Sequence, residues 1–82
     1  MSYQEHNIQF EDLQKYIIHL DSDEGIRIDN LDDKIFVNKI ANRYIILVSK
    51  NGNDEFFYFY EPVDVLNFLK NNTKSQSKIF SY

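Results

Sequence analysis

The dipeptide Asn51-Gly52 constrains the fold of this chain most strongly, because it lies between two runs rich in β-branched and aromatic residues. Asn-Gly is the preferred centre of a type I′ turn, in which two residues connect antiparallel strands. It therefore predicts a hairpin with strands over 43–50 and 53–61. A two-residue turn also sets the register of the hairpin, so that Lys50 is expected opposite Asn53.

Two further strands are predicted before this hairpin. Short runs with high β-propensity cover 26–30 and 35–40. The second of these runs is followed by a tight two-residue connection at 41–42 and then by the strand over 43–50. The four strands together predict an antiparallel meander.

A helix is predicted at each end of the meander. Apolar residues recur at helical spacing over 9–20, which predicts the first helix there. Pro62 suits the first position of a helix, where its missing N–H has no helical partner, and it predicts the second helix over about 62–71. The tail, 73–82, is polar until its last residues, which is typical of either a flexible segment or an edge strand.

This order of elements, α-β-β-β-β-α, predicts the α+β class. We expect a single domain over 1–82, built as a small two-layer sandwich in which a four-stranded antiparallel meander is flanked by an N-terminal and a C-terminal helix. The chain has 82 residues, of which 43% are hydrophobic, and this is enough for one core.

The predicted register divides the meander into two different faces. One face is more uniformly apolar than the other, and we assign it to the core under the helices. It collects Ile35, Val37, Tyr44, Ile46, Val48, Phe57 and Phe59. The other face mixes apolar, aromatic and polar residues. It collects Phe36, Asn38, Ile40, Arg43, Ile45, Leu47, Phe56, Tyr58 and Tyr60.

The second face has two interpretations. A helix or the tail could cover it, so that both faces of the sheet are buried. Alternatively it is exposed, and an apolar patch of this size on a monomer then indicates an interaction site. Tyr, Phe and Arg are also enriched in protein interfaces. We therefore take Arg43, Phe56, Tyr58 and Tyr60 as candidate residues for binding a partner or for homodimer formation.

Charge suggests a second candidate surface. The net charge is −4, but residues 1–33 carry nine acids and two bases, whereas 34–82 carry four acids and seven bases. Acids in a helix face and polar turns are commonly just solvated, but a negative field also attracts basic proteins and repels phosphate. The candidate acidic surface would then dock on a basic, nucleic-acid-handling protein. It comprises Asp21, Asp23, Glu24, Asp29, Asp32 and Asp33.

The usual components of catalytic and cofactor sites are missing from the sequence. There is no Cys, there are two His, and no Gly-x-Ser-x-Gly motif occurs. Two glycines cannot build a loop that cradles phosphate. The acids after His19 depart from a calcium-binding loop, because Gly25 stands one position too early. We therefore expect no enzymatic activity, no catalytic residue, no metal and no cofactor.

Nucleic-acid binding is a further alternative. Aromatic residues on strands can stack the bases of a single strand. Four bases, Lys39, Arg43, Lys50 and Lys70, are too few for a convincing track along a phosphate backbone, and the net charge opposes it. A protein-binding module, or a homodimeric structural or regulatory module, agrees better with the sequence.

Composition also bears on source and location. Phe, Tyr, Met, Ile, Asn and Lys supply 40 residues, whereas Gly, Ala, Arg and Pro supply 6, which is the codon bias of an AT-rich genome. A phage or mobile element in such a host is the expected source. The start of the chain, MSYQEHNIQF, has no basic and apolar signal-peptide pattern, and no apolar run reaches the roughly 18 residues of a membrane span. With no Cys, a cytoplasmic protein is expected.

The stretch IILVSKNGNDEFFYFYEPVDVLNFLKNN (45–72) has the order strand, Asn-Gly turn, strand, helix. This layout resembles that of some small phage-encoded anti-CRISPR proteins, which set helices around an antiparallel sheet and present acidic side chains to a Cas nuclease. The resemblance covers about a third of the chain and assigns no role to any residue. It implies a small inhibitor or modulator that binds a host protein.

Overall fold

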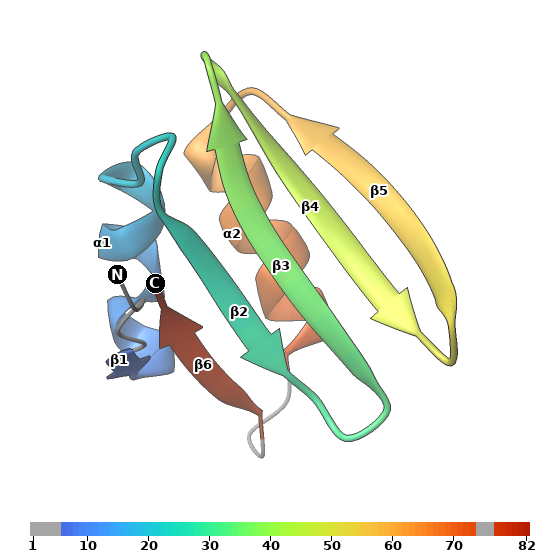
Figure 1. Cartoon of the computed structure of the whole chain (residues 1–82). Coiled ribbons are helices and arrows are strands. Elements are labelled where there is room, and N and C mark those ends of the chain that lie inside the picture. Colours follow the sequence, from blue (N-terminus) through green and yellow to red (C-terminus); the bar gives the residue numbers. More distant parts are fainter. Residues whose placement is uncertain (1–5, 74–76) are drawn as a thin grey trace.

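The computed structural model describes residues 6–73 and 77–82. The described residues form one six-stranded antiparallel sheet, in the order β1-β6-β2-β3-β4-β5, with two α-helices on one side of it (Figure 1). The α+β class and the antiparallel sheet are thus confirmed. In chain order the elements are β1 (His6–Ile8), the 3-10 helix η1 (Phe10–Asp12), α1 (Leu13–Ile18), β2 (Gly25–Asp29), β3 (Asp33–Ile40), β4 (Arg43–Lys50), β5 (Asn53–Phe59), α2 (Pro62–Asn72) and β6 (Lys78–Ser81).

The hairpin at Asn51-Gly52 forms as predicted. Asn51 has a φ of 52° and Gly52 a φ of 81°, and a type I′ turn requires positive φ at both positions. Lys50 is paired with Asn53 across the turn. The preceding hairpin, around 41–42, also has the expected antiparallel register. Local sequence therefore predicts the pairing of β3, β4 and β5 residue by residue.

The sheet has more strands than the predicted four-stranded meander. The sequence predicted a flexible tail or an edge strand for 73–82, but Lys78–Ser81 form β6 inside the sheet, between β2 and β1. Gly25 and Tyr82 exchange backbone hydrogen bonds of 2.8 and 2.9 Å at one end of this pairing. Residues 74–76, within the predicted tail, lie outside the described residues, as do residues 1–5 at the start of the chain.

The N-terminal helix is shorter than the predicted span of 9–20. A 3-10 turn precedes α1, which covers only Leu13–Ile18. Phe10, the first apolar residue of the expected stripe, is 42% exposed, whereas Leu13, Ile17 and Leu20 are buried. The C-terminal helix agrees with the prediction, because α2 begins at Pro62 and ends one residue beyond 71. Neither of these described helices has the length and apolarity to cross a membrane.

The core lies on the side of the sheet that the two helices cover (Figure 1). Every residue that we assigned to the core face is buried or packs against the core. The hydroxyl of Tyr44 donates a hydrogen bond of 3.1 Å to the carbonyl of Ile17, which links β4 to α1. The ring of Phe68 on α2 lies 4.8 Å from that of Phe57 and 5.7 Å from that of Phe59. The apolar face of the meander is therefore the surface on which both helices pack.

Candidate functional site

The opposite side of the sheet carries neither helix, and it faces the viewer in Figure 1. The interpretation in which helices bury both faces is therefore wrong, because the two described helices share one side. Phe56, Tyr58 and Tyr60 are 57%, 55% and 65% exposed. We call this surface the open face. Its residues are Asn7, Gly25, Arg27, Asp29, Lys34, Phe36, Asn38, Ile40, Arg43, Ile45, Leu47, Ser49, Asp54, Phe56, Tyr58, Tyr60, Lys78, Phe80 and Tyr82.

Strand register arranges open-face side chains in rows that cross the sheet. One row runs through directly opposed residues from β6 to β5. It contains Phe80, Arg27, Phe36, Leu47 and Phe56. Side chains that are directly opposite on neighbouring strands lie about 5 Å apart and are in contact. The row is therefore a continuous apolar band with one cation in it, and it joins Phe80 to residues far earlier in the chain.

Two arginines lie against aromatic rings of the open face. The guanidinium carbon of Arg43 is 5.4 Å from the centre of the Tyr58 ring, and that of Arg27 is 4.6 Å from the Phe80 ring. A cation over an aromatic face is attracted by the negative charge of the ring face. The structure thus brings together the predicted residues Arg43 and Tyr58. It adds Arg27 and Phe80, which the sequence analysis did not select.

A local signal for Arg27 was present in the sequence. Arg27 stands between Ile26 and Ile28, and both of these isoleucines are fully buried. Strand alternation would have placed Arg27 on the face opposite them. Phe80 gave no comparable signal, because its position on the open face depends on the pairing of β6 with β2.

A recess opens between the α1–β2 turn and the open face. It has a volume of about 590 Å³. It is lined by Ser22, Asp23, Glu24, Arg27, Phe36, Asn38 and Tyr82. Beside it, a Cβ added to Gly25 would come within 2.5 Å of the Tyr82 ring. The recess therefore combines an acidic rim with aromatic walls, and the glycine is needed so that the Tyr82 ring can lie against the β2 backbone.

The predicted acidic surface is divided between the two ends of β2 (Figure 1). Asp21, Asp23 and Glu24 are exposed in the turn before this strand. Asp32 lies in the turn after it, and Asp33 is the first residue of β3. At about 3.3 Å per residue, the five residues of β2 separate these turns by more than 10 Å. The acids therefore form two small groups rather than one surface.

Three of the predicted acids have structural contacts through their carboxylates. That of Glu24 accepts a hydrogen bond of 3.0 Å from the backbone N–H of Asp21. Oδ1 of Asp29 lies 3.2 Å from Nε of Arg27 on the open face. Asp33 accepts a hydrogen bond of 2.6 Å from the side-chain amide of Asn30, which also donates to the carbonyl of Asn72 at 3.2 Å. The hydroxyl of Ser77 donates to the amide oxygen of Asn30. Asp33 thus belongs to a network that ties the β2–β3 turn to the end of α2 and the start of β6.

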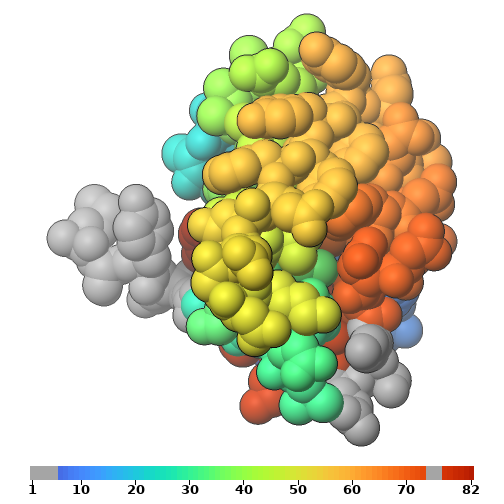
Figure 2. All heavy atoms as spheres, turned by 90° about the vertical axis from the view of Figure 1, so that its right-hand side faces the viewer, coloured from blue at the N-terminus to red at the C-terminus, as the bar shows by residue number. Residues whose placement is uncertain are grey.

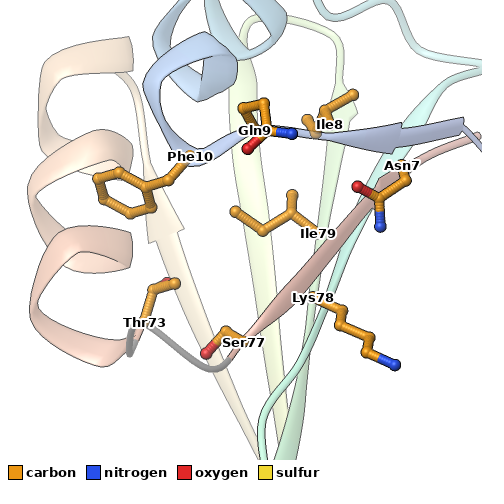
Figure 3. A pocket seen from close by; sticks show the side chains of 8 residues that line it. All are labelled: Asn7, Ile8, Gln9, Phe10, Thr73, Ser77, Lys78 and Ile79. Carbon is orange, nitrogen blue, oxygen red and sulfur yellow. The ribbon is translucent and has the colours of Figure 1, made fainter.

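Another cavity, of about 460 Å³, lies between β1, the end of α2 and the start of β6 (Figure 3). It is lined by Asn7, Ile8, Gln9, Phe10, Thr73, Ser77, Lys78 and Ile79. Lys78 contributes the only charged side chain among these, and it extends away from the others (Figure 3). Within 6–73 and 77–82, no three His, Asp or Glu side chains gather in a way that could hold a metal ion.

The fold and the site together define the class of the protein: a small antiparallel α+β sandwich with one face covered by helices and one open aromatic face. No family model matches the sequence, and neither the curated proteins nor the solved structures contain a significant match to it.

Proposed function

We propose that this chain is a small, non-enzymatic interaction module that binds a protein partner through its open face. The observation that carries the proposal is the continuous aromatic and aliphatic band across five strands, with Phe56, Tyr58 and Tyr60 more than half exposed. Apolar side chains gathered in this way are costly to leave in water, and monomers rarely expose large contiguous patches of them.

The chemistry of the open face agrees with that of a binding hot spot. Tyr and Arg are the residues that most often dominate interface energetics, and the Arg43–Tyr58 pair places both at one point. Carboxylates border the band at the recess, where Asp23 and Glu24 form the rim. At the other end of β2, Asp29 lies beside Arg27 and opposite Lys34 and Lys78, which offset its charge. A partner with an apolar contact surface and a basic group against the recess would be complementary to this face.

We also propose the class of protein to which the partner belongs. The codon bias of the composition favours a phage or mobile element as the source, and such small interaction modules act as inhibitors or modulators of host proteins. The acidic border favours a basic, nucleic-acid-handling protein in the cytoplasm of the host.

Affinity capture with matched variants tests this function. We would use the wild-type chain, a Phe56→Ala/Tyr58→Ala variant and an Asp32→Lys/Asp33→Lys variant as baits in a host lysate, and quantify captured proteins by mass spectrometry. The aromatic variant should lose the partner by roughly thirtyfold or more, since a single hot-spot truncation costs about 2 kcal/mol. The acidic variant should retain it. The opposite result would move the function to the β2–β3 turn.

A homodimer is the second candidate function, because the same band could be covered by another copy of the chain. Light scattering at high micromolar concentration separates the two candidates. A monomer would argue against the homodimer. A dimer that Phe56→Ala/Tyr58→Ala dissociates would favour it over a separate partner.

A further inference from the structure

The outer edge of β5 has no neighbouring strand among the described residues. β5 is the last strand in the sheet order and pairs only with β4. Figure 2 looks directly at this edge, and the atoms of β5, in yellow and light orange, fill the middle of the view. The opposite edge is formed by β1, which has only three residues. β5 is therefore the long free edge of the sheet.

Exposed edges are usually protected by charged side chains, Pro, a bulge or a very short strand. Of these features β5 has only the charges of Asp54 and Glu55, near its start. It pairs with β4 without interruption from Asn53 to Phe59, and its sequence, NDEFFYF, contains neither Lys nor Pro. The aromatic half of the strand, Phe56–Phe59, also lacks a charge. This half presents a regular template for another strand.

The register shows which backbone groups face outward. Residues that flank a two-residue turn form a hydrogen-bonded pair, and such pairs alternate along an antiparallel ladder. Lys50 and Asn53 flank the turn, so Phe57 is again at a hydrogen-bonded position. Phe56 and Tyr58 fall at the alternate positions, where N–H and C=O point away from β4. An added strand would bond to these two residues, whose side chains lie on the open face.

We propose that the β5 edge accepts an extended segment of a protein partner whose centre is apolar and whose ends are basic. Asp54 and Glu55 lie at the start of β5, and Glu61 and Asp64 follow its end, all four exposed. β5 itself has no basic residue. The neighbouring strand β4 has one base at each end, Arg43 and Lys50, and the Arg43 guanidinium lies over the Tyr58 ring. Four acids against these two bases leave the edge negative overall. This inference rests on the proposed function, and it identifies how the partner of the open face attaches.

The same charges disfavour a second copy as the occupant. An antiparallel pair of β5 edges, with Phe57 on the two-fold axis, would set Asn53 of one copy opposite Glu61 of the other. Each end of the pair would then collect Asp54 and Glu55 from one copy and Glu61 and Asp64 from the other. Like charges at such spacing repel one another. A segment with basic ends is attracted at both ends instead.

The apolar centre follows from the surroundings of the edge. Alternate side chains of an added strand would lie beside Phe56 and Tyr58 on the open face. The others would lie on the helix side, next to Phe57 and Phe59, which are only half-buried. Aromatic or β-branched residues in the added strand would stabilise both sets of contacts.

A synthetic peptide provides the test. The probe is a short peptide of alternating Val and Thr with two Lys residues at each end. Its binding should perturb the backbone amide NMR signals of Phe56 and Tyr58 and slow their hydrogen exchange. Two matched peptides are the controls, one with Glu in place of Lys and one N-methylated at alternate residues. Each should bind about tenfold more weakly, the first through charge and the second through lost main-chain hydrogen bonds.

Binding of the N-methylated peptide with undiminished affinity would overturn edge pairing, because its charges and side chains are unchanged. Equal binding of the Glu-ended peptide would overturn the basic partner. Dimerisation of the chain alone, with slowed exchange at Phe56 and Tyr58, would show that the occupant is a second copy, contrary to the proposal.

Two variants of one residue separate this inference from the proposed function. Tyr58→Pro removes an N–H that does not pair with β4, so the hairpin is preserved, whereas Tyr58→Ala removes only the ring. Tyr58→Pro should weaken binding of the Lys-ended peptide about tenfold more than Tyr58→Ala does. If both variants weaken it equally, the open face binds the peptide and the edge does not. If neither variant affects capture of the natural partner, the proposed function itself fails.

Discussion

Ala41 and Gly52 both have a positive φ, but only Ala41 carries a Cβ. Ala41 has a φ of 56° and Gly52 a φ of 81°, and left-handed backbone costs a residue with a Cβ about 1 kcal/mol. We expect Ala41→Gly to raise the free energy of unfolding by up to about 1 kcal/mol, and Gly52→Ala to lower it by a similar amount. Urea denaturation followed by circular dichroism measures both. A loss of stability in Ala41→Gly would contradict this account.

Tyr44 gives the molecule a pH-dependent contact. Burial first, and the Glu61 carboxylate second, raise the pKa of the Tyr44 hydroxyl above its ordinary value near 10. A pKa that is raised by folding means that the stabilising contribution is complete below about pH 10 and is lost as pH rises through the folded pKa. We therefore expect wild-type stability to fall above pH 10.

The comparison for this prediction is Tyr44→Phe. At pH 7 the variant should be about 1 kcal/mol less stable than wild type, because the hydrogen bond to Ile17 is lost. Its stability should fall less at alkaline pH, since the buried ionisable hydroxyl is gone. Denaturant melts between pH 8 and 11 would show the two curves converging. Parallel curves would mean that other tyrosines cause the alkaline loss.

Among the elements, β6 is important for the sheet although its sequence indicates a strand only weakly. It joins β1 to β2, with Ile79 in the core and Phe80 on the open face. Ile79→Ala should lower the free energy of unfolding by about 2–5 kcal/mol, as expected for a truncated core residue. Phe80→Ala should cost about 1 kcal/mol, through its contact with Arg27. Denaturant unfolding measures both free-energy losses. Equal losses would contradict the placement of Ile79 in the core and of Phe80 on the open face.

On the scale of the whole molecule, the structure predicts that a lysine unfolds the chain when it is introduced on the covered face of the sheet but is tolerated on the open face. Ile46 is fully buried, whereas Phe56 is 57% exposed. Ile46→Lys should unfold the chain, because an unpaired buried charge costs several kcal/mol. Phe56→Lys should change stability by less than about 1 kcal/mol. Circular dichroism with thermal melts distinguishes them, and unfolding by both would show that the open face is covered in solution.

Prediction from sequence succeeded where the determining contacts are local. The Asn51-Gly52 turn defines the β4–β5 register through its own backbone preference. Pro62 marks the start of α2 for an equally local reason. It failed for β1, and for 73–82 it left a flexible tail or an edge strand open, whereas β6 lies inside the sheet. Both strands are short and have no clear alternation of their own. They are strands because β6 pairs with β2, about fifty positions earlier in the chain, and β1 pairs with β6.

The candidate site shows the same division. The sequence identified Arg43, Phe56, Tyr58 and Tyr60, because alternation along one hairpin places them on one face. It did not find Arg27 or Phe80, whose neighbours come from distant strands. It also grouped acids that the structure separates to the two ends of β2. The sequence shows that the acids of one turn are neighbours, but it does not show whether two different turns lie close together in space.

By itself, the sequence determined how the run EFFYFY divides between two faces, because a strand alternates its side chains wherever it lies. Only the tertiary structure decided whether the second face is covered as well. Both helices pack on the side of Phe57 and Phe59, and β6 extends the sheet instead of covering the side of Phe56 and Tyr58. The reason is that alternation is a property of the local backbone, whereas burial depends on where distant apolar segments find the largest common surface.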